Sequence, residues 1–278
     1  MKHKFGGVWT EQKLDALEKY LGFFPVALGN KQFNLVYIDT FAGTGSVTIE
    51  TSGVERTIPG SAAIALRLKH PFDRYFFIER RRRHVGALQA LTSNHPLRTR
   101  CTITHGDARD ELRRVLEALN WADTRGVLFL DPYGLQCTWD MVQLIARTRA
   151  LDVFFLVSVS GLTRQAARSA SAIDIKKQEA LDRFLGTNEW REALYKPPAQ
   201  EDMFIADPVH RRESGVDPIL QFVEARLKSE FAHVESPALL RGPNNAVLFA
   251  LYFAVSNRSE AAIRLATKVV RPMLGGIQ

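Results

Sequence analysis

An acidic residue followed by a glycine-bearing turn is the feature of this sequence best suited to chemistry. Asp39 stands directly after the apolar run 35–38 and opens the segment Asp39-Thr40-Phe41-Ala42-Gly43-Thr44-Gly45. A buried strand ending here would place a hydrogen-bond acceptor and bare glycine backbone at the carboxyl edge of a sheet. Open α/β sheets bind nucleotide-like ligands at that edge. A plain glycine turn with Asp39 as a local cap is the alternative.

Two further acidic residues follow apolar runs in the same way. Glu79 ends the run 75–78, and a carboxylate at this place can accept hydrogen bonds from both hydroxyls of a ribose. Asp107 follows the next predicted strand and could accept from the amino group of an adenine, with Ala108 leaving room for the ring. The alternatives are a surface pair between Glu79 and Arg80, and an N-cap role for Asp107 that is compatible with ligand binding.

The elements that must position these residues alternate along the chain. Apolar runs predict strands at residues 35–38, 75–78, 101–104, 127–130, 153–159, 233–240 and 247–255. The last two are joined closely enough for a hairpin, and helical spacing of apolar residues separates most of the others. We therefore expect an α/β, Rossmann-like fold with a mostly parallel, seven-stranded sheet and an antiparallel terminal strand. Residues 1–278 would form one domain, with 161–217 as a helical insertion or lid.

Basic residues outnumber acidic ones, which favours a polyanionic partner. The net charge of the 278 residues is +7, and Arg80, Arg81, Arg82 and Arg83 form an unbroken run. Guanidinium groups suit bidentate phosphate contacts better than ammonium groups do. The run therefore predicts a nucleic-acid contact, and a solvated helix face is the alternative.

The two cysteines argue against a metal site. Cys101 and Cys137 are single and far apart, so neither a zinc site nor a disulfide framework is predicted, and a reducing cytoplasm is expected. No apolar stretch approaches the roughly 20 residues that span a bilayer, so we expect no membrane association. The basic N-terminus has no apolar core behind it, which argues against a signal peptide.

An antiparallel terminal strand beside a doubly wound sheet resembles the class I S-adenosylmethionine (AdoMet) methyltransferases. The 39–45 segment resembles their D-x-F-A-G-x-G motif. Asp131-Pro132-Tyr133-Gly134, after the run 127–130, resembles the Asp/Asn-Pro-Pro-Tyr/Phe turn with which amino-methyltransferases receive a target amine. Only one proline is present, so the resemblance does not extend to N-methylation of adenine or guanine. A purely structural turn is the alternative.

One family combines all of these motifs. The chain resembles the three-Cys-motif partner proteins (TcmP) in Asp39-x-Phe-Ala-Gly-x-Gly45, Glu79, Gly106-Asp107, Leu130-Asp131-Pro132-Tyr133-Gly134, Trp139, Lys13, Tyr20-Leu21, Gly60-Ser61 and the late strand 253–257. The resemblance implies an AdoMet-dependent methyltransferase fold, often encoded beside a radical-type protein that carries three cysteines. The segment 161–217 matches weakly.

These observations give one set of predicted site residues. AdoMet would be bound by Asp39, Phe41, Ala42, Gly43, Gly45, Glu79, Asp107 and Ala108, and the acceptor would meet Asp131, Pro132 and Tyr133. Asp131 would orient or deprotonate the acceptor, and Tyr133 would stack on it.

Three hypotheses about function follow. The first is an AdoMet-dependent methyltransferase acting on nucleic acid. The second is an accessory protein that binds AdoMet but is inactive, or active only with the three-cysteine partner. The third, an NAD-type oxidoreductase, is disfavoured because the G-x-G-x-x-G motif is incomplete and an inserted loop at 47–58 separates Gly45 from the next helix.

Overall fold

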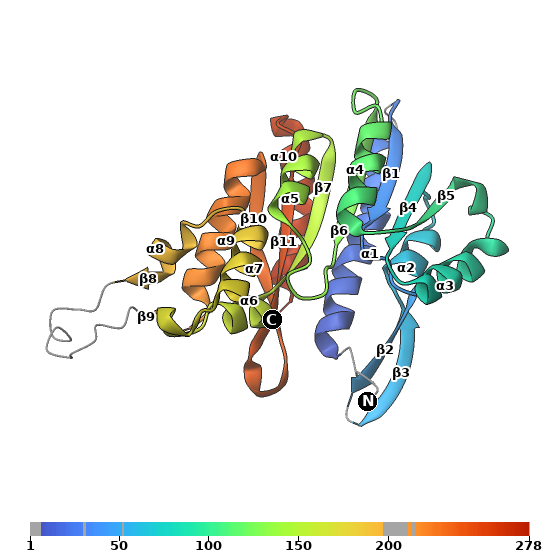
Figure 1. The fold of residues 1–278 in the computed structure, drawn as a ribbon. Coiled ribbons are helices and arrows are strands. Elements are labelled where there is room, and N and C mark those ends of the chain that lie inside the picture. Colours follow the sequence, from blue (N-terminus) through green and yellow to red (C-terminus); the bar gives the residue numbers. More distant parts are fainter. Residues whose placement is uncertain (1–6, 30–31, 52, 197–210, 213–214, 278) are drawn as a thin grey trace, which may run out of the picture.

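A sheet of seven strands forms the centre of the protein (Figure 1). In this computed structural model the described residues are 7–29, 32–51, 53–196, 211–212 and 215–277. The strands lie in the order β10-β11-β7-β6-β1-β4-β5, and their bounds are β1 Asn34–Asp39, β4 Arg74–Glu79, β5 Cys101–His105, β6 Thr124–Leu130, β7 Leu151–Ser158, β10 His233–Arg241 and β11 Val247–Val255. β11 pairs antiparallel with β7 and β10, and the other pairings are parallel. The predicted fold class is confirmed.

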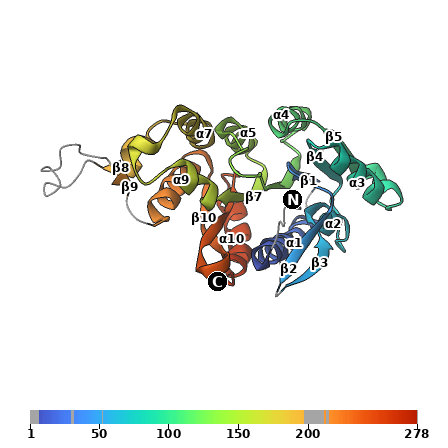
Figure 2. The same cartoon turned by 60° about the horizontal axis from the view of Figure 1, so that its bottom comes forward.

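Helices cover both faces of this sheet (Figure 2). One face packs against helices α4 Ala108–Ala118, α5 Trp139–Arg147 and α9 Asp217–Glu230. The other packs against α1 Val8–Leu28, α2 Ser61–Leu66, α3 Arg82–Ser93 and α10 Glu260–Gly275. Side chains of one strand alternate between the two cores, so Ile38 points to the first and Tyr37 to the second. Burial on both faces explains why the central strands are apolar throughout.

The predicted loop at 47–58 is wrong, because this segment is a two-stranded hairpin. β2 Ser46–Thr51 and β3 Val54–Pro59 pair antiparallel directly after the glycine-bearing turn. They project beyond the sheet at the same edge as the turn between β10 and β11 (Figure 1). The residues Ser46-Val47-Thr48-Ile49 alternate polar and β-branched apolar side chains, a strand pattern that Gly53 and the charged residues obscured. No helix follows Gly45 directly, as predicted.

The chain between β7 and α9 is largely helical where it is described. It contains α6 Val159–Gln165, α7 Ile175–Leu185, α8 Trp190–Leu194 and the short pair β8 Tyr195–Lys196 and β9 Arg211–Arg212. Phe184, Trp190 and Tyr195 extend the core shared with α5 and α9. Residues 197–210 and 213–214, part of the predicted 161–217 insertion, lie outside the described residues. Its role as a lid, and the one-domain organisation, stay predictions.

The described part of the chain has neither a membrane-spanning helix nor a candidate metal cluster. None of its helices is long and apolar enough to cross a bilayer. No group of three or more His, Cys, Asp or Glu residues there could hold a metal ion.

Candidate functional site

Asp39 organises the loop that follows β1. Its side chain is fully buried, and it accepts hydrogen bonds from the Phe41 amide to Oδ1 at 3.3 Å and from the Tyr37 hydroxyl to Oδ2 at 3.3 Å. The Ser61 hydroxyl, at the start of α2, also hydrogen-bonds to this carboxylate. Burial raises the pKa of Asp39 to about 7, the Ser61 hydrogen bond opposes the rise, and the nearby charge of Asp131 adds to it. Asp39 therefore holds β1, its loop and α2 together.

The glycines of this loop adopt backbone conformations that side chains disfavour. Gly43 has φ +62° and Gly45 has φ +79°. A Cβ on Gly43 would meet no atom within 4 Å, so its backbone borders open space. Gly60 packs against the same turn, where a Cβ would lie 3.0 Å from the carbonyl carbon of Gly45. Glycine at position 45 is therefore required by the shape of the loop. At Gly43 the absence of a side chain leaves the backbone accessible to a ligand.

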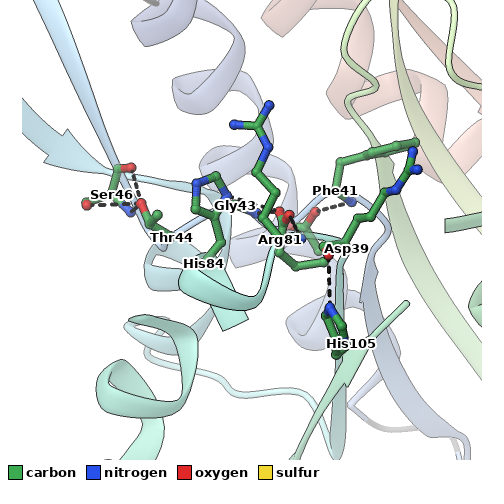
Figure 3. A network of polar contacts seen from close by, with 10 residues as sticks. Asp39, Phe41, Gly43, Thr44, Ser46, Arg81, His84 and His105 are labelled. Atoms are coloured by element: carbon green, nitrogen blue, oxygen red, sulfur yellow. Dashed lines mark hydrogen bonds and ion pairs between the residues drawn. The ribbon is translucent and has the colours of Figure 1, made fainter. Parts of the chain in front are cut away.

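Glu79 joins this loop to the end of β4, and Figure 3 labels three of the residues around it, Gly43, Arg81 and His84. Its Oε2 accepts from the Gly43 amide at 3.0 Å, and its Oε1 accepts from the Arg81 amide at 2.7 Å. His84 Nδ1 lies 3.5 Å from Oε2 and is buried without a hydrogen-bond partner among the described residues. The structure therefore gives Glu79 backbone partners rather than the side chain of Arg80. Sequence analysis missed His84, which lies in the first turn of α3 and has no motif around it.

Asp107 caps α4, as its alternative interpretation predicted. Its Oδ1 accepts from the Arg109 amide at 3.0 Å, and Ala108 begins the helix. At the end of β5, His105 Nε2 lies 3.0 Å from the carbonyl oxygen of Arg80, which follows β4. Glu79 is the last residue of β4 and Asp107 follows the adjacent strand β5, so both lie at the carboxyl edge of the sheet.

Asp131 forms an ion pair with Lys13 of α1 at the end of β6. The two residues are 118 positions apart in the chain, and both side chains are largely buried. Tyr133, two residues further on, is 63% exposed. Lys13 entered sequence analysis only through the family resemblance, because a single lysine on an amphipathic helix carries no signal of its own.

A cavity of about 450 Å³ lies where these elements meet. Its lining includes Phe41, Ala42, Gly43, Gly45, Asp131, Pro132 and Tyr133, all predicted site residues. Ser61 and Lys13 line it too, together with residues that sequence analysis missed: Trp9, Arg164 and Phe249. Four predicted residues are not part of the lining: Asp39 is buried at the end of β1, and Glu79, Asp107 and Ala108 lie beyond the loop at the ends of β4 and β5.

The arginine run lies at the start of α3, outside this cavity. Arg80, Arg81, Arg82 and Arg83 are all exposed, and the last two occupy the first turn of the helix. None of the four guanidinium groups has an acidic partner among the described residues, whereas Arg109 and Arg113 of α4 both pair with Asp140. A helix N-terminus disfavours cations and favours anions. The run is therefore uncompensated positive charge beside Glu79.

Comparisons with known proteins bear on the fold. No protein-family model matches the chain, and no curated protein does. Protein LPL1258 from Legionella pneumophila, of the family DUF519, is 12% identical, with a TM-score of 0.53 over 95% of this chain and 92% of that protein. An O-methyltransferase from Bacillus cereus in complex with SAH is also 12% identical, with a TM-score of 0.43 over 86% and 80% of the two chains. Spermidine synthase from Thermotoga maritima is 11% identical, with a TM-score of 0.42 over 90% and 60%.

At these identities the similarity concerns the fold alone. The order of the seven strands, with β11 antiparallel between β7 and β10, defines a Rossmann-like α/β fold with a mostly parallel sheet.

Proposed function

We propose that this protein is an AdoMet-dependent methyltransferase that acts on a nucleic acid. The observation that carries the proposal is the convergence of two motifs on one cavity. The glycine-bearing loop after β1 and the Asp131-Pro132-Tyr133 turn after β6 both line it, at the carboxyl edge of a methyltransferase-like sheet. This edge is where such sheets bind nucleotide-like ligands.

The residues at this edge fit AdoMet. Glu79 accepts two backbone amides, yet each carboxylate oxygen has a further lone pair that a ribose hydroxyl can use. The open space above Gly43 admits a ligand against the backbone. AdoMet would be held by Phe41, Ala42, Gly43, Gly45, Glu79, Asp107 and Ala108, with Asp39 acting through the loop. The bound cofactor supplies an electrophilic methyl group.

The Asp131 turn would receive the acceptor. Lys13 pairs with Oδ2 of Asp131, which leaves Oδ1 to accept a hydrogen from the acceptor nitrogen or oxygen. That hydrogen must leave as a proton when the acceptor atom gains a methyl group, and Asp131 is placed to orient it or take it. The Pro132 carbonyl is a second acceptor, and the exposed ring of Tyr133 offers a stacking surface. Lys13 is a positioning residue because it fixes the carboxylate.

Two features support a nucleic acid as the substrate. The uncompensated arginines at the start of α3 provide phosphate contacts on the same edge of the sheet. The cavity carries four aromatic side chains, Trp9, Phe41, Tyr133 and Phe249, on which an unpaired base can stack. Arg164 adds a cation to the cavity wall.

The proposal is tested by isothermal titration with AdoMet and S-adenosylhomocysteine, followed by transfer of labelled methyl groups to RNA and DNA. We expect both ligands to bind, Asp39→Ala to weaken them strongly because the loop loses its anchor, and at least one nucleic acid to be labelled. Failure of the wild-type protein to bind either ligand would overturn the cofactor assignment.

The same experiment distinguishes an independent methyltransferase from the alternative, an accessory protein that binds AdoMet. Binding of AdoMet without labelling of any nucleic acid would contradict the proposed substrate. If labelling then appeared only after a three-cysteine partner was added, the partner-dependent hypothesis would replace an independent enzyme.

A further inference from the structure

A second cavity lies at the opposite edge of the sheet, where the parallel strands begin. Its volume is about 270 Å³, and it lies between α1 and α10, which run side by side (Figure 2). Arg125 at the start of β6, Asp152 at the start of β7 and Asn257 after β11 line its sheet side. This volume is slightly below the range of about 300–1,000 Å³ for pockets that hold drug-sized ligands, which suits a ligand of fragment size.

The walls of this cavity are apolar and aromatic. Phe23, Phe24 and the ring of Tyr20 come from α1, and Ala262 and Leu265 come from α10. Leu265 is one of the few large apolar side chains that the protein exposes. An apolar ligand bound here would be shielded from water by α1 on one side and by α10 on the other, which favours binding.

The carboxylate of Asp152 stands at the base of these walls with a single partner. The Tyr20 hydroxyl donates to Oδ2 at 2.6 Å, and no other described residue donates to this carboxylate. Asp152 lies between Val127 and Val255 of the flanking strands, which offer it no side-chain donor. Oδ1 is not among the buried, unpartnered atoms of the described residues, so it is open to the cavity. A partly buried carboxylate with one donor among apolar walls is stabilised when a ligand donates to its second oxygen.

Arg125 does not neutralise this carboxylate. Its guanidinium lies over the ring of Phe33, 4.3 Å from the centroid, and its Nη1 donates to the carbonyl oxygens of Trp121 and Thr124. No ion pair links Asp152 to a described cation, in contrast to Asp131 and its partner Lys13. The cavity therefore presents an uncompensated acceptor inside apolar walls.

We propose that this cavity binds a small organic ammonium ion that carries an apolar or aromatic group. The ammonium would donate to Oδ1 of Asp152, and the apolar group would pack between Phe24 of α1 and Leu265 of α10. A charged donor is preferred because its hydrogen bond to a carboxylate in a water-poor site is stronger than that of a neutral donor. This site is independent of the proposed methyltransferase site, which lies at the other edge.

Benzylamine is a suitable probe, and benzyl alcohol is its neutral counterpart of the same shape. Ligand-observed NMR titration of the full chain at pH 8 should show saturable binding of benzylamine, with benzyl alcohol weaker by about tenfold. Asp152→Asn keeps the acceptor for Tyr20 and removes the charge, and it should weaken benzylamine by about tenfold or more.

Two further variants keep the proposal falsifiable if Asp152→Asn fails to fold. Ala262→Phe fills the cavity while leaving Asp152 in place, and it should abolish benzylamine binding. Asp174→Ala alters an exposed carboxylate far from the cavity and should leave benzylamine binding unchanged. Binding that does not saturate, that is equal for the two probes, or that survives Ala262→Phe would overturn the proposal.

Discussion

Asp39, a fully buried carboxylate, and Asp152, a partly buried one, lie at opposite edges of one sheet, and their surroundings differ. Burial raises the pKa of each to about 7. Asp39 has three described partners, Tyr37, Phe41 and Ser61, and it also lies close to the charge of Asp131. Asp152 has Tyr20 alone. A similar pKa therefore arises from a filled hydrogen-bond network in one place and from an open one in the other.

The difference separates a structural role from a binding role. The partners of Asp39 belong to the loop and helix that it fixes, so the proposed ligand at that edge would meet the neighbours of Asp39 instead of its carboxylate. The free oxygen of Asp152 faces a cavity, where a ligand can complete its hydrogen bonds. A perturbed pKa marks both sites, but only the inventory of partners distinguishes them.

The largest expected effect is a loss of methyl-transfer rate on substitution of Asp131, which lies at the same carboxyl edge of the sheet as Asp39. Asp131→Ala should lower the rate of methyl transfer by about 10²–10⁴-fold, because the acceptor loses the group that orients or takes its proton. Single-turnover rates with a labelled methyl donor measure this. Asp174→Ala is the control, and a normal rate in Asp131→Ala would assign the turn a purely structural role.

The second effect is on the pH dependence of the free energy of unfolding, and it tests the comparison between Asp152 and Asp39 directly. Asp152 ionises near pH 7 when folded and near 3.8 when unfolded, so between these pH values the folded state binds the extra proton. The stability contributed by this group is therefore present below about pH 4 and lost as the pH rises toward 7. At pH 8 the loss is at most a few kcal/mol, because each pKa unit corresponds to about 1.36 kcal/mol and solvent reaches this partly buried carboxylate.

Urea unfolding at pH 5 and pH 8 tests this sign. Asp152→Asn should be more stable than the wild type at pH 8, because the buried charge is gone and the hydrogen bond from Tyr20 remains. Asp39→Asn should gain less, since an amide cannot accept from all three partners of Asp39. Equal gains for the two variants would break the comparison.

A smaller effect is expected at Glu79. Glu79→Gln leaves one side-chain oxygen for two backbone donors, Gly43 and Arg81, so the loop loosens and AdoMet affinity should fall by about tenfold. Isothermal titration measures this, with Glu55→Gln on the exposed hairpin as the control. An unchanged affinity would remove Glu79 from the cofactor site.

The smallest effect concerns the charged surface of the carboxyl edge. Changing Arg82 and Arg83 together to Ala should weaken nucleic acid binding and reduce its salt dependence by about 0.7–0.9 for each lost phosphate contact. Arg113 and Arg114, which pair with Asp140 and Glu111, form the matched control. If both double variants changed the salt dependence equally, the uncompensated run would have no special role.

Local sequence determined the strands, their acidic ends and the glycine turn. The apolar runs before Asp39, Glu79 and Asp131 are short-range patterns, and burial on both faces of a parallel sheet requires them. The positive φ angles of Gly43 and Gly45 are equally local, since glycine adopts them at no steric cost. The antiparallel last strand could be predicted because a short segment joins the last two apolar runs, and such a join favours a hairpin.

Only the tertiary structure decided which of these residues share a cavity. Lys13 meets Asp131 across 118 positions because α1 packs on the sheet, and Phe249 enters the same cavity because β11 pairs beside β7 in one register. The sequence around Asp152 gives no signal for its contact with Tyr20, which exists only because α1 packs over the start of β7. Periodicity and turn stereochemistry act over a few residues, whereas these contacts depend on the packing of helices against a sheet that the whole chain builds.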